Sequence, residues 1–364
     1  GQRPFSYLPT GYQSLCSANL PDPTILLPNN HFEALVYTGN GGTQSITGLQ
    51  FQPDWLWIKE RTDAESFNVL FDAIRGVTKA IYSNSATTEN TGTALTSFDS
   101  GGFTLSLDTN QARSNDSGDS YVAWNWNAGG STVTNNDGAI SSQVRTNSTA
   151  GFSIVTYTGD GGNPSTVGHG LGVAADVVIV KNRSYAANWG IFHHKNTSAP
   201  ETEIIYLNSN GGTNDRAVFN DTLPTSTVFS VKAFDEVNNI NQNYVAYCFS
   251  EVAGYSKFGS YTGNGSTDGS FVFTGFRPAF ILLKRTNTAA SWVIHDDKRA
   301  GYNGDNDYLH PDNSQAESDG SSGTLDIVAN GFKLRMTAGT HNGSGDTFIY
   351  LAFAEAPFKY ARAR

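Results

Sequence analysis

The chain has 364 residues, a formal net charge of −10, 38% hydrophobic residues, 15% charged residues and 38 glycines. Together with many Asn, Ser and Thr, this composition is typical of a loop-rich all-β protein, and an aromatic content of 12% excludes a disordered chain. The acidic balance without a Lys/Arg patch excludes a nucleic-acid partner, and no stretch approaches the ~20 apolar residues of a membrane span.

Residues 1–31 are expected to form an extended N-terminal segment. Residues 32–128 then show a defined order of features, which opens with "YTGNG" at Tyr37. The apolar run "DWLWIKER", which contains Lys59, does not alternate and predicts a central strand covered on both faces. The closing segment "YVAWNW" alternates, with Val122, Trp124 and Trp126 on one side, and predicts a strand with one buried face.

Residues 129–151 are rich in Gly, Ser, Thr and Asn, which predicts a connector with one short strand. The same order of features returns in residues 152–254, with "YTGDG", "DVVIVKNR" and "YVAYCF". It returns again in residues 255–364, with "YTGNG", "AFILLKRT" and "FIYLAF". Lys181 and Lys284 occupy the place of Lys59 in these copies.

A repeat of roughly a hundred residues is longer than a solenoid or propeller unit, so each copy is expected to be a self-contained domain. The resulting prediction is an all-β fold with three tandem β-sandwich domains, jelly-roll-like or lectin-like. Because the second junction is much shorter than the first, domains two and three are expected to be held more rigidly than domains one and two.

The glycine turns are the first candidate ligand site. A phosphate loop needs a helix N-terminus behind it, whereas strand-like sequence follows each of these turns and the P-loop lysine is missing. Asn-Gly and Asp-Gly are turn formers because both residues tolerate positive φ. We therefore expect structural turns, with no cofactor bound.

Carboxylates are the second candidate. Residues 115–120 ("NDSGDS") and 303–313 ("NGDNDYLHPDN") gather oxygen ligands suited to Ca²⁺, although solvated turns look similar and neither segment matches the twelve-residue calcium loop. Asp72 and Asp296 hold equivalent places, where the second copy has His193 or His194. No nucleophile, base and orienting group occur together in one copy, so we predict a protein that is not an enzyme, with no metal, cofactor or catalytic residue assigned.

Aromatic residues are the third candidate, because sugar-binding sites stack rings on saccharides. Trp124 aligns with Tyr247 and Leu351, an apolar series that predicts core packing. Trp189 and Trp292 align with Asn68 and could lie at an accessible sheet edge, but core packing is favoured for them as well.

Cysteine usage indicates no disulfide framework and no zinc site. Cys16 and Cys248 lie far apart, and Cys248 falls in the apolar run "YVAYCFSEV", which predicts a buried free thiol. The sequence begins with a glycine and its only methionine is Met336, so we expect a processed or truncated piece of a longer protein.

Long stretches of the chain resemble a family of tailed-phage virion proteins found in marine bacteriophages. The resemblance lies in "GFSIVTYTGDGG", "VGHGLGVAADVVIVKNRS", "YVAYCFSEVAGYSKFGSYTGNGSTDGSFVFTGFRPAFILLKR" and "FIYLAFAEAPFKYARAR". It runs from about residue 32 to the C-terminus. The opening 25 residues resemble a segment that follows a SPRY-type domain in relatives, which implies a missing upstream domain.

The resemblance implies a non-enzymatic structural protein on the exterior of a virion, in a tail fibre or otherwise tail-associated, that could contact the host surface. A head fibre or a capsid decoration protein is an alternative. Implied partners are other virion proteins and copies of the same chain, with a trimer as the first expectation for a fibre. A glycan-binding adhesin and, less favoured, a polysaccharide depolymerase remain as alternatives, and no catalytic residue is implied.

Overall fold

The computed structural model describes residues 19–20, 22–64, 66–92, 94–107, 113–299, 303, 306–318 and 323–361. In that part of the chain the regular elements are strands and three short 3-10 helices: η2 (Pro28–Asn30), η3 (Pro200–Thr202) and η4 (Ala217–Phe219). The all-β prediction is therefore confirmed. Among the described residues, no helix is long and apolar enough to cross a membrane.

Three large antiparallel sheets carry most of the chain. Sheet 1 has the order β1 (Phe32–Thr38), β9 (Ser120–Trp126), β3 (Trp55–Glu60), β4 (Val69–Asp72), β5 (Lys79–Tyr82), β6 (Asn90–Thr91). Sheet 2 has the order β10 (Val133–Asn135), β11 (Ser142–Asn147), β12 (Phe152–Thr158), β19 (Asn243–Phe249), β14 (Val177–Asn182), β15 (Gly190–His193), β16 (Glu203–Tyr206), β17 (Asn214–Asp215). Sheet 3 has the order β20 (Ser256–Thr262), β26 (Thr347–Pro357), β22 (Phe276–Arg285), β23 (Val293–Asp296).

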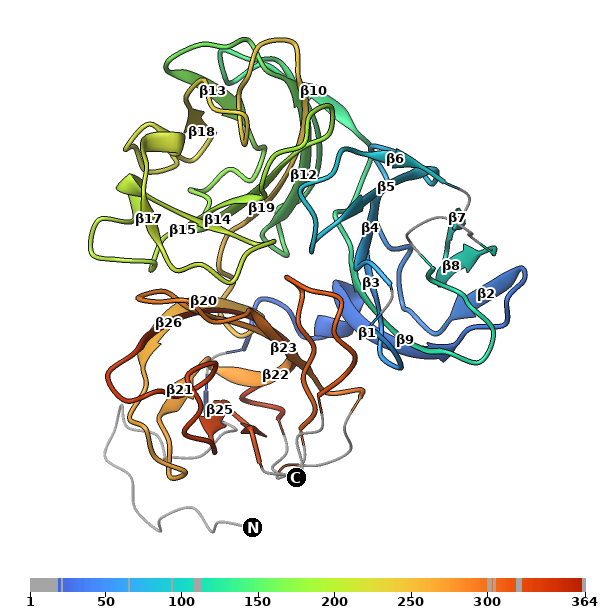
Figure 1. Cartoon of the computed structure of the whole chain (residues 1–364), viewed down its shortest axis with the longest axis vertical. Coiled ribbons are helices and arrows are strands. Elements are labelled where there is room, and N and C mark those ends of the chain that lie inside the picture. Colours follow the sequence, from blue (N-terminus) through green and yellow to red (C-terminus); the bar gives the residue numbers. More distant parts are fainter. Residues whose placement is uncertain are drawn as a thin grey trace.

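Each large sheet is accompanied by a small one. The small sheets are β2 (Gln44–Thr47), β8 (Gly102–Leu105), β7 (Leu95–Asp99); β13 (Ser165–Gly168), β18 (Val228–Val231); and β21 (Phe271–Phe273), β25 (Gly331–Leu334), β24 (Leu325–Val328). The three large sheets share one strand order. The last strand of each copy (β9, β19, β26) lies between its first strand (β1, β12, β20) and its lysine-ended strand (β3, β14, β22). Figure 1 shows the large sheets around a common centre, with the small sheets on the periphery.

The lysine-ended strands β3, β14 and β22 are buried along nearly their whole length, as their non-alternating apolar sequence predicts. In β3, Trp55 and Trp57 face the centre of the molecule, while Leu56 and Ile58 face the adjacent small sheet. Successive side chains of a strand point to opposite faces, so a strand covered on both sides must be apolar at every position.

The prediction of one buried face for "YVAWNW" is wrong. Val122, Trp124 and Trp126 of β9 join the central core, while Tyr121 and Ala123 join the core under the small sheet. The alternation in this strand therefore divides its side chains between two cores, because both faces of sheet 1 are covered by other sheets. The connector also differs from its prediction, since it holds two strands, β10 and β11, that extend sheet 2.

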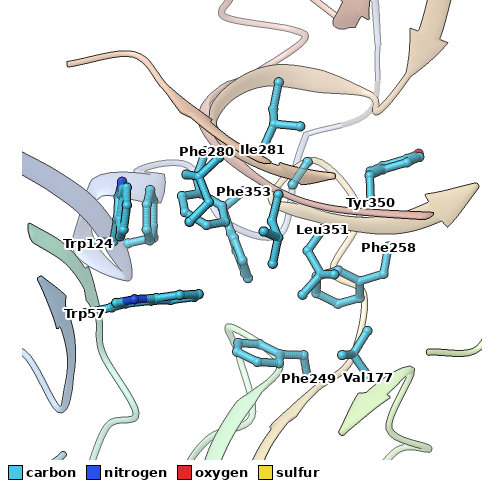
Figure 2. Close-up of a cluster of buried hydrophobic side chains, with 14 of the residues drawn as sticks. Trp57, Trp124, Val177, Phe249, Phe258, Phe280, Ile281, Tyr350, Leu351 and Phe353 are labelled. Atoms are coloured by element: carbon cyan, nitrogen blue, oxygen red, sulfur yellow. The ribbon is translucent and has the colours of Figure 1, made fainter. Parts of the chain in front are cut away.

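The largest hydrophobic core lies between the three large sheets. Cross-sheet ring contacts join all three pairs of sheets: Trp55 lies 4.4 Å from Tyr247, and Phe353 lies 5.7 Å from both Trp126 and Phe249, measured between ring centroids. Figure 2 shows side chains of the three sheets meeting in this cluster. Since each buried aromatic side chain removes about 150–250 Å² from water, the shared core is a main contribution to stability.

Candidate functional site

The polar and aromatic side chains that recur at equivalent positions of the three copies lie at the borders between the large sheets. We call the contact of sheets 1 and 2 junction A, that of sheets 2 and 3 junction B, and that of sheets 3 and 1 junction C. One backbone hydrogen bond recurs at each junction: Glu89 N–H donates to Arg183 O (2.9 Å), Thr213 to Thr286 (2.8 Å) and Glu317 to Arg61 (2.9 Å). The three junctions can therefore be compared position by position.

Asp72, His193 and Asp296, which hold equivalent places in the three copies, lie apart at the three junctions. Asp72 accepts a hydrogen bond from Tyr247 OH (2.8 Å) and pairs with Arg75 at junction A. Asp296 accepts from the Trp124 indole N–H (2.9 Å) at junction C. His193 donates from Nε2 to the carbonyl of Tyr350 (3.2 Å) at junction B, and burial lowers its pKa to about 3. Each group is committed to a neighbouring sheet.

The aligned positions Asn68, Trp189 and Trp292 also cross the junctions. Trp189 Nε1 donates to the carbonyl of Tyr82 (2.9 Å) and Trp292 Nε1 to that of Tyr206 (2.9 Å). Asn68 Nδ2 reaches carbonyl oxygens of residues 310, 311 and 313. Both indoles are fully buried. Core packing is therefore confirmed for both tryptophans, and neither forms an accessible ring platform for a sugar.

The three aligned lysines are buried, and each reaches the preceding sheet in the ring. Lys181 Nζ donates to Ala86 O (3.1 Å), Lys284 Nζ to Asn210 O (2.9 Å) and Lys59 Nζ to Asn313 O (3.4 Å). Burial lowers their pKa values to about 7 for Lys59 and Lys181 and to about 8 for Lys284. The repeated lysine thus has a structural role between sheets.

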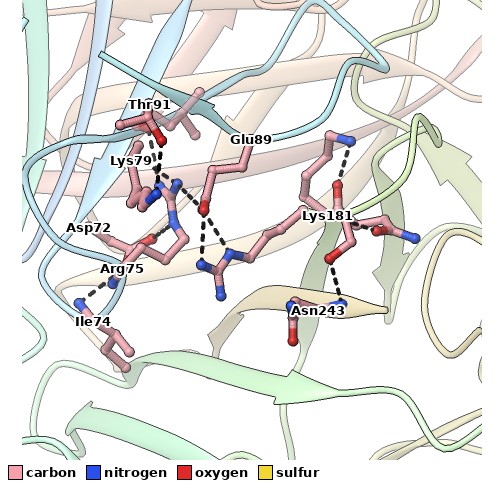
Figure 3. Close-up of polar contacts among 12 residues, drawn as sticks. Asp72, Ile74, Arg75, Lys79, Glu89, Thr91, Lys181 and Asn243 are labelled. Atoms are coloured by element: carbon pink, nitrogen blue, oxygen red, sulfur yellow. Dashed lines mark hydrogen bonds and ion pairs between the residues drawn. The ribbon is translucent and has the colours of Figure 1, made fainter. Parts of the chain in front are cut away.

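Junctions A and C are each closed by a carboxylate between two guanidinium groups. Glu89 pairs with Arg183 (2.7 Å) and Arg75 (3.2 Å), as Figure 3 shows in part. Glu317 pairs with Arg61 (2.7 Å) and Arg299 (2.6 Å). Pairs of this kind, largely removed from water, join the outer rims of neighbouring sheets.

Among the residues that the structure describes, no such bridge closes junction B, and a polar cleft lies in its place. Thr213 and Thr286 stand where the other junctions have Glu and Arg. Because the hydroxyl side chains are short, they leave space, and a pocket of about 810 Å³ lies beside them. Its lining is mostly hydroxyl, amide and charged side chains from β16, β17, β20 and the adjoining loops.

Asn196 lines the cleft and has an unsatisfied hydrogen-bond donor that is itself buried. The side chain is 94% buried, and its Oδ1 accepts from Thr213 Oγ1 (2.7 Å), whereas its Nδ2 has no partner among the described residues. A buried donor without a partner costs about 1–3 kcal/mol, so an acceptor atom placed there would be favoured.

Two carboxylates also line the cleft. Glu203 and Asp215 are cross-strand partners in β16 and β17, and both line the pocket. Partial burial raises the pKa of Glu203, and the charge of Asp215 raises it further. Like charges placed opposite each other on neighbouring strands destabilise a sheet, so these carboxylates favour a ligand that donates hydrogen bonds.

The glycine turns are structural in all three copies. Tyr37, Tyr157 and Tyr261 each donate a hydrogen bond of 2.6–2.7 Å to a carbonyl of the loop before the last strand. In the first copy, the Asn115 side chain clamps the turn by accepting from Asn40 N–H (3.1 Å) and donating to Gly42 O (2.6 Å). Equivalent asparagines in the other copies, Asn238 and Asn342, make the same contacts.

The structure places the two segments proposed to bind calcium, 115–120 and 303–313, in different surroundings. Asn115 is used by the turn, while Asp119 of the same segment lies beside two other carboxylates, Glu60 and Asp63. The segment 303–313 lies partly outside the described residues, and Asn303 and Asn306 within it bind carbonyls of β24. His193 and His194 point to different partners, and Cys248 is a buried free thiol, as predicted; Cys16 lies outside the described residues.

Sequence reasoning missed Thr213 and Glu203, which belong to no recognisable motif, and Asn196, whose Asn-x-Ser sequence is expected by chance in a chain so rich in Asn, Ser and Thr. One signal lies in the equivalent positions of the copies. The first copy has both Arg61 and Glu89, whereas the second has Thr213 in place of the glutamate and the third has Thr286 in place of the arginine. Comparison of the chain with curated proteins finds no match, and comparison with solved structures finds none either. Residues 27–357 match the family described as "Domain of unknown function (DUF7483)", and the chain therefore belongs to that family.

Proposed function

We propose that the chain is three tandem β-sandwich copies joined into one three-sided body, and that it serves as a non-enzymatic structural protein on the exterior of a tailed-phage particle. The proposed position is a tail fibre or another tail-associated part. The common strand order of the three large sheets supports the repeat, and the resemblance to tailed-phage virion proteins supports the location.

The observation that carries the structural role is the ring of contacts around the shared core. Asp72, His193 and Asp296 are each buried and bonded to a neighbouring sheet. Polar side chains that could serve catalysis thus act as links between sheets. Such links suit a protein that must keep its shape outside a cell.

The cleft at junction B is the proposed contact with the host surface, and its ligand is a saccharide. A sugar hydroxyl can accept from Asn196 Nδ2 and donate to Glu203 or Asp215, which matches the lining of the cleft. The cleft volume of about 810 Å³ falls within the range of about 300–1,000 Å³ found for ligand pockets, in which specificity comes from a few placed hydrogen-bonding groups.

Two measurements test the proposal. Mass spectrometry and a density map of purified particles should find the chain on the exterior, and its absence from the particle would refute the virion role. For the cleft, host lipopolysaccharide and capsule oligosaccharides should bind the wild-type chain. Asn196→Asp, which removes the donor but keeps the side-chain shape, should lower the affinity at least tenfold, whereas Asn136→Asp on the exposed connector should not.

Incubation of the chain with host polysaccharide separates binding from hydrolysis. New reducing ends released from host polysaccharide by the wild-type chain, and lost in Glu203→Gln, would replace the non-enzymatic proposal with a depolymerase. We also propose that copies of this chain assemble into a homo-oligomer, with a trimer as the first expectation, and the mass of the assembled protein in solution tests this.

A further inference from the structure

Three carboxylates meet at the rim of sheet 1, outside the cleft and the junctions described above. Glu60 ends β3, Asp63 follows in the next loop, and Asp119 directly precedes β9. One oxygen of each lies within 4.8 Å of those of the other two. Oxygens that bind the same Ca²⁺ at about 2.4 Å lie at most about 4.8 Å apart, so the three groups can share one ion.

Glu60 supplies a second observation, independent of the clustering. Its side chain is 97% buried, and Ser66 Oγ donates to its Oε2. Its Oε1 is also buried and has no hydrogen-bond partner among the described residues. A buried carboxylate oxygen without a partner is costly, and a bound cation removes that cost.

The other two sheets provide an internal comparison at the same register. Glu60 pairs with Tyr121 across the strands, Asn182 with Tyr244, and Arg285 with Phe348. Asn182 is neutral, and its amide makes hydrogen bonds of 2.8–3.2 Å to Asp235 O, Tyr244 OH and two backbone N–H groups.

In sheet 3 the protein supplies the cation itself. Arg285 lies 2.9 Å from Asp346, the residue that directly precedes β26 as Asp119 directly precedes β9. Sheet 1 has the acidic residue in this place and a glutamate in place of the arginine. The geometry points to a divalent cation, Ca²⁺, bound by Glu60, Asp63 and Asp119, with water filling its remaining positions.

The oxygen-only ligand set favours Ca²⁺ over zinc, which prefers nitrogen and sulfur ligands. Two of the three ligands lie in loops, and Ca²⁺ accepts the irregular geometry that loops provide better than Mg²⁺ does. The ion would hold the loop after β3 against the loop before β9. Arg61, which pairs with Glu317 at junction C, adjoins this site, so the ion would also order that contact.

Calorimetric titration of the EDTA-treated chain with Ca²⁺ tests the site. We expect one Ca²⁺ bound per chain at this site, and at least tenfold weaker binding in Asp119→Asn. The matched control is Asp346→Asn, which removes the equivalent carboxylate of sheet 3 and should leave Ca²⁺ binding unchanged. Equal Ca²⁺ binding by the wild type and Asp119→Asn would overturn the proposal, as would no binding by the wild type.

Glu60→Gln provides an independent readout. It places a neutral amide where sheet 2 has Asn182, so the variant should melt in EDTA at or above the wild-type temperature. Ca²⁺ should raise the melting temperature of the wild type and leave that of Glu60→Gln unchanged. If Ca²⁺ stabilises both proteins equally, the ion binds elsewhere and the assignment is wrong.

Discussion

Replacing Tyr247 with phenylalanine tests whether junction A is held by polar contacts as well as by packing. The Tyr247 hydroxyl donates to Asp72 Oδ2 (2.8 Å), and its ring stacks on Trp55 at 4.4 Å between centroids. Both Tyr247 and Asp72 are fully buried. Because phenylalanine keeps the ring, the substitution removes the hydroxyl and leaves the stacking in place.

The expected cost follows from the kind of bond that is lost. A hydrogen bond to a charged group contributes about 1.5–3 kcal/mol. Asp72 keeps its contacts with the Arg75 guanidinium and with the backbone N–H groups of Ile74 and Arg75, so the carboxylate does not lose all its partners. We therefore expect Tyr247→Phe to lower the free energy of unfolding by about 2 kcal/mol.

Urea unfolding followed by tryptophan fluorescence and circular dichroism measures this change. Both signals should report one transition with a lower midpoint and an unchanged slope, because the three large sheets share one core. Tyr185→Phe, at a residue that is 52% exposed, serves as the control and should change stability by less than about 0.5 kcal/mol.

Two outcomes would refute this reasoning. A loss of less than about 0.5 kcal/mol in Tyr247→Phe would mean that the hydrogen bond from Tyr247 to Asp72 does not stabilise junction A. Separate transitions for the two signals would mean that the copies unfold independently, as the sequence expectation of self-contained domains requires. A double-mutant cycle that combines Tyr247→Phe with Asp72→Asn then isolates the interaction energy between the two side chains.

Stability should also depend on pH through the three buried lysines, Lys59, Lys181 and Lys284. Burial lowers their pKa values in the folded chain to about 7, 7 and 8, whereas an exposed lysine in the unfolded chain has the ordinary value of 10.5. Between the folded and unfolded pKa values the chain takes up protons when it unfolds, so its stability rises with pH from about 7.5 to 9.5. In urea unfolding, we expect the free energy of unfolding to rise by at least about 1 kcal/mol per pH unit. The rise should be smaller in Lys181→Met. A wild-type free energy of unfolding that does not change with pH would contradict the assignment. In the first glycine turn, a Cβ on Gly39 would lie 2.1 Å from Asp116 O, so Gly39→Ala should cost more than about 2 kcal/mol. Gly42, whose nearest such contact is 3.7 Å, is the control, and an equal effect of Gly42→Ala would argue against steric exclusion.

Much of the strand pattern could be predicted from local sequence. The run around Trp55 predicts a strand covered on both faces because its side chains are apolar at consecutive positions, and β3 is such a strand. The repeated lysines are recognisable as equivalent, but their bonds to a neighbouring sheet are not, because each partner carbonyl lies more than 70 residues away in the chain.

The candidate sites depend on contacts between residues far apart in the chain, which local sequence does not encode. Asn196 looks like one polar residue among many until Thr213 and sheet 3 surround it, and Glu60 meets Asp119 only through the pairing of β3 with β9. The sequence alone determined the all-β class, the repeated order of features and the burial of the lysine-ended strands, because composition, recurring segments and consecutive apolar residues can be recognised along the chain. Only the tertiary structure decided that the large sheets enclose one core, and which polar groups face each other, because burial between sheets depends on long-range packing.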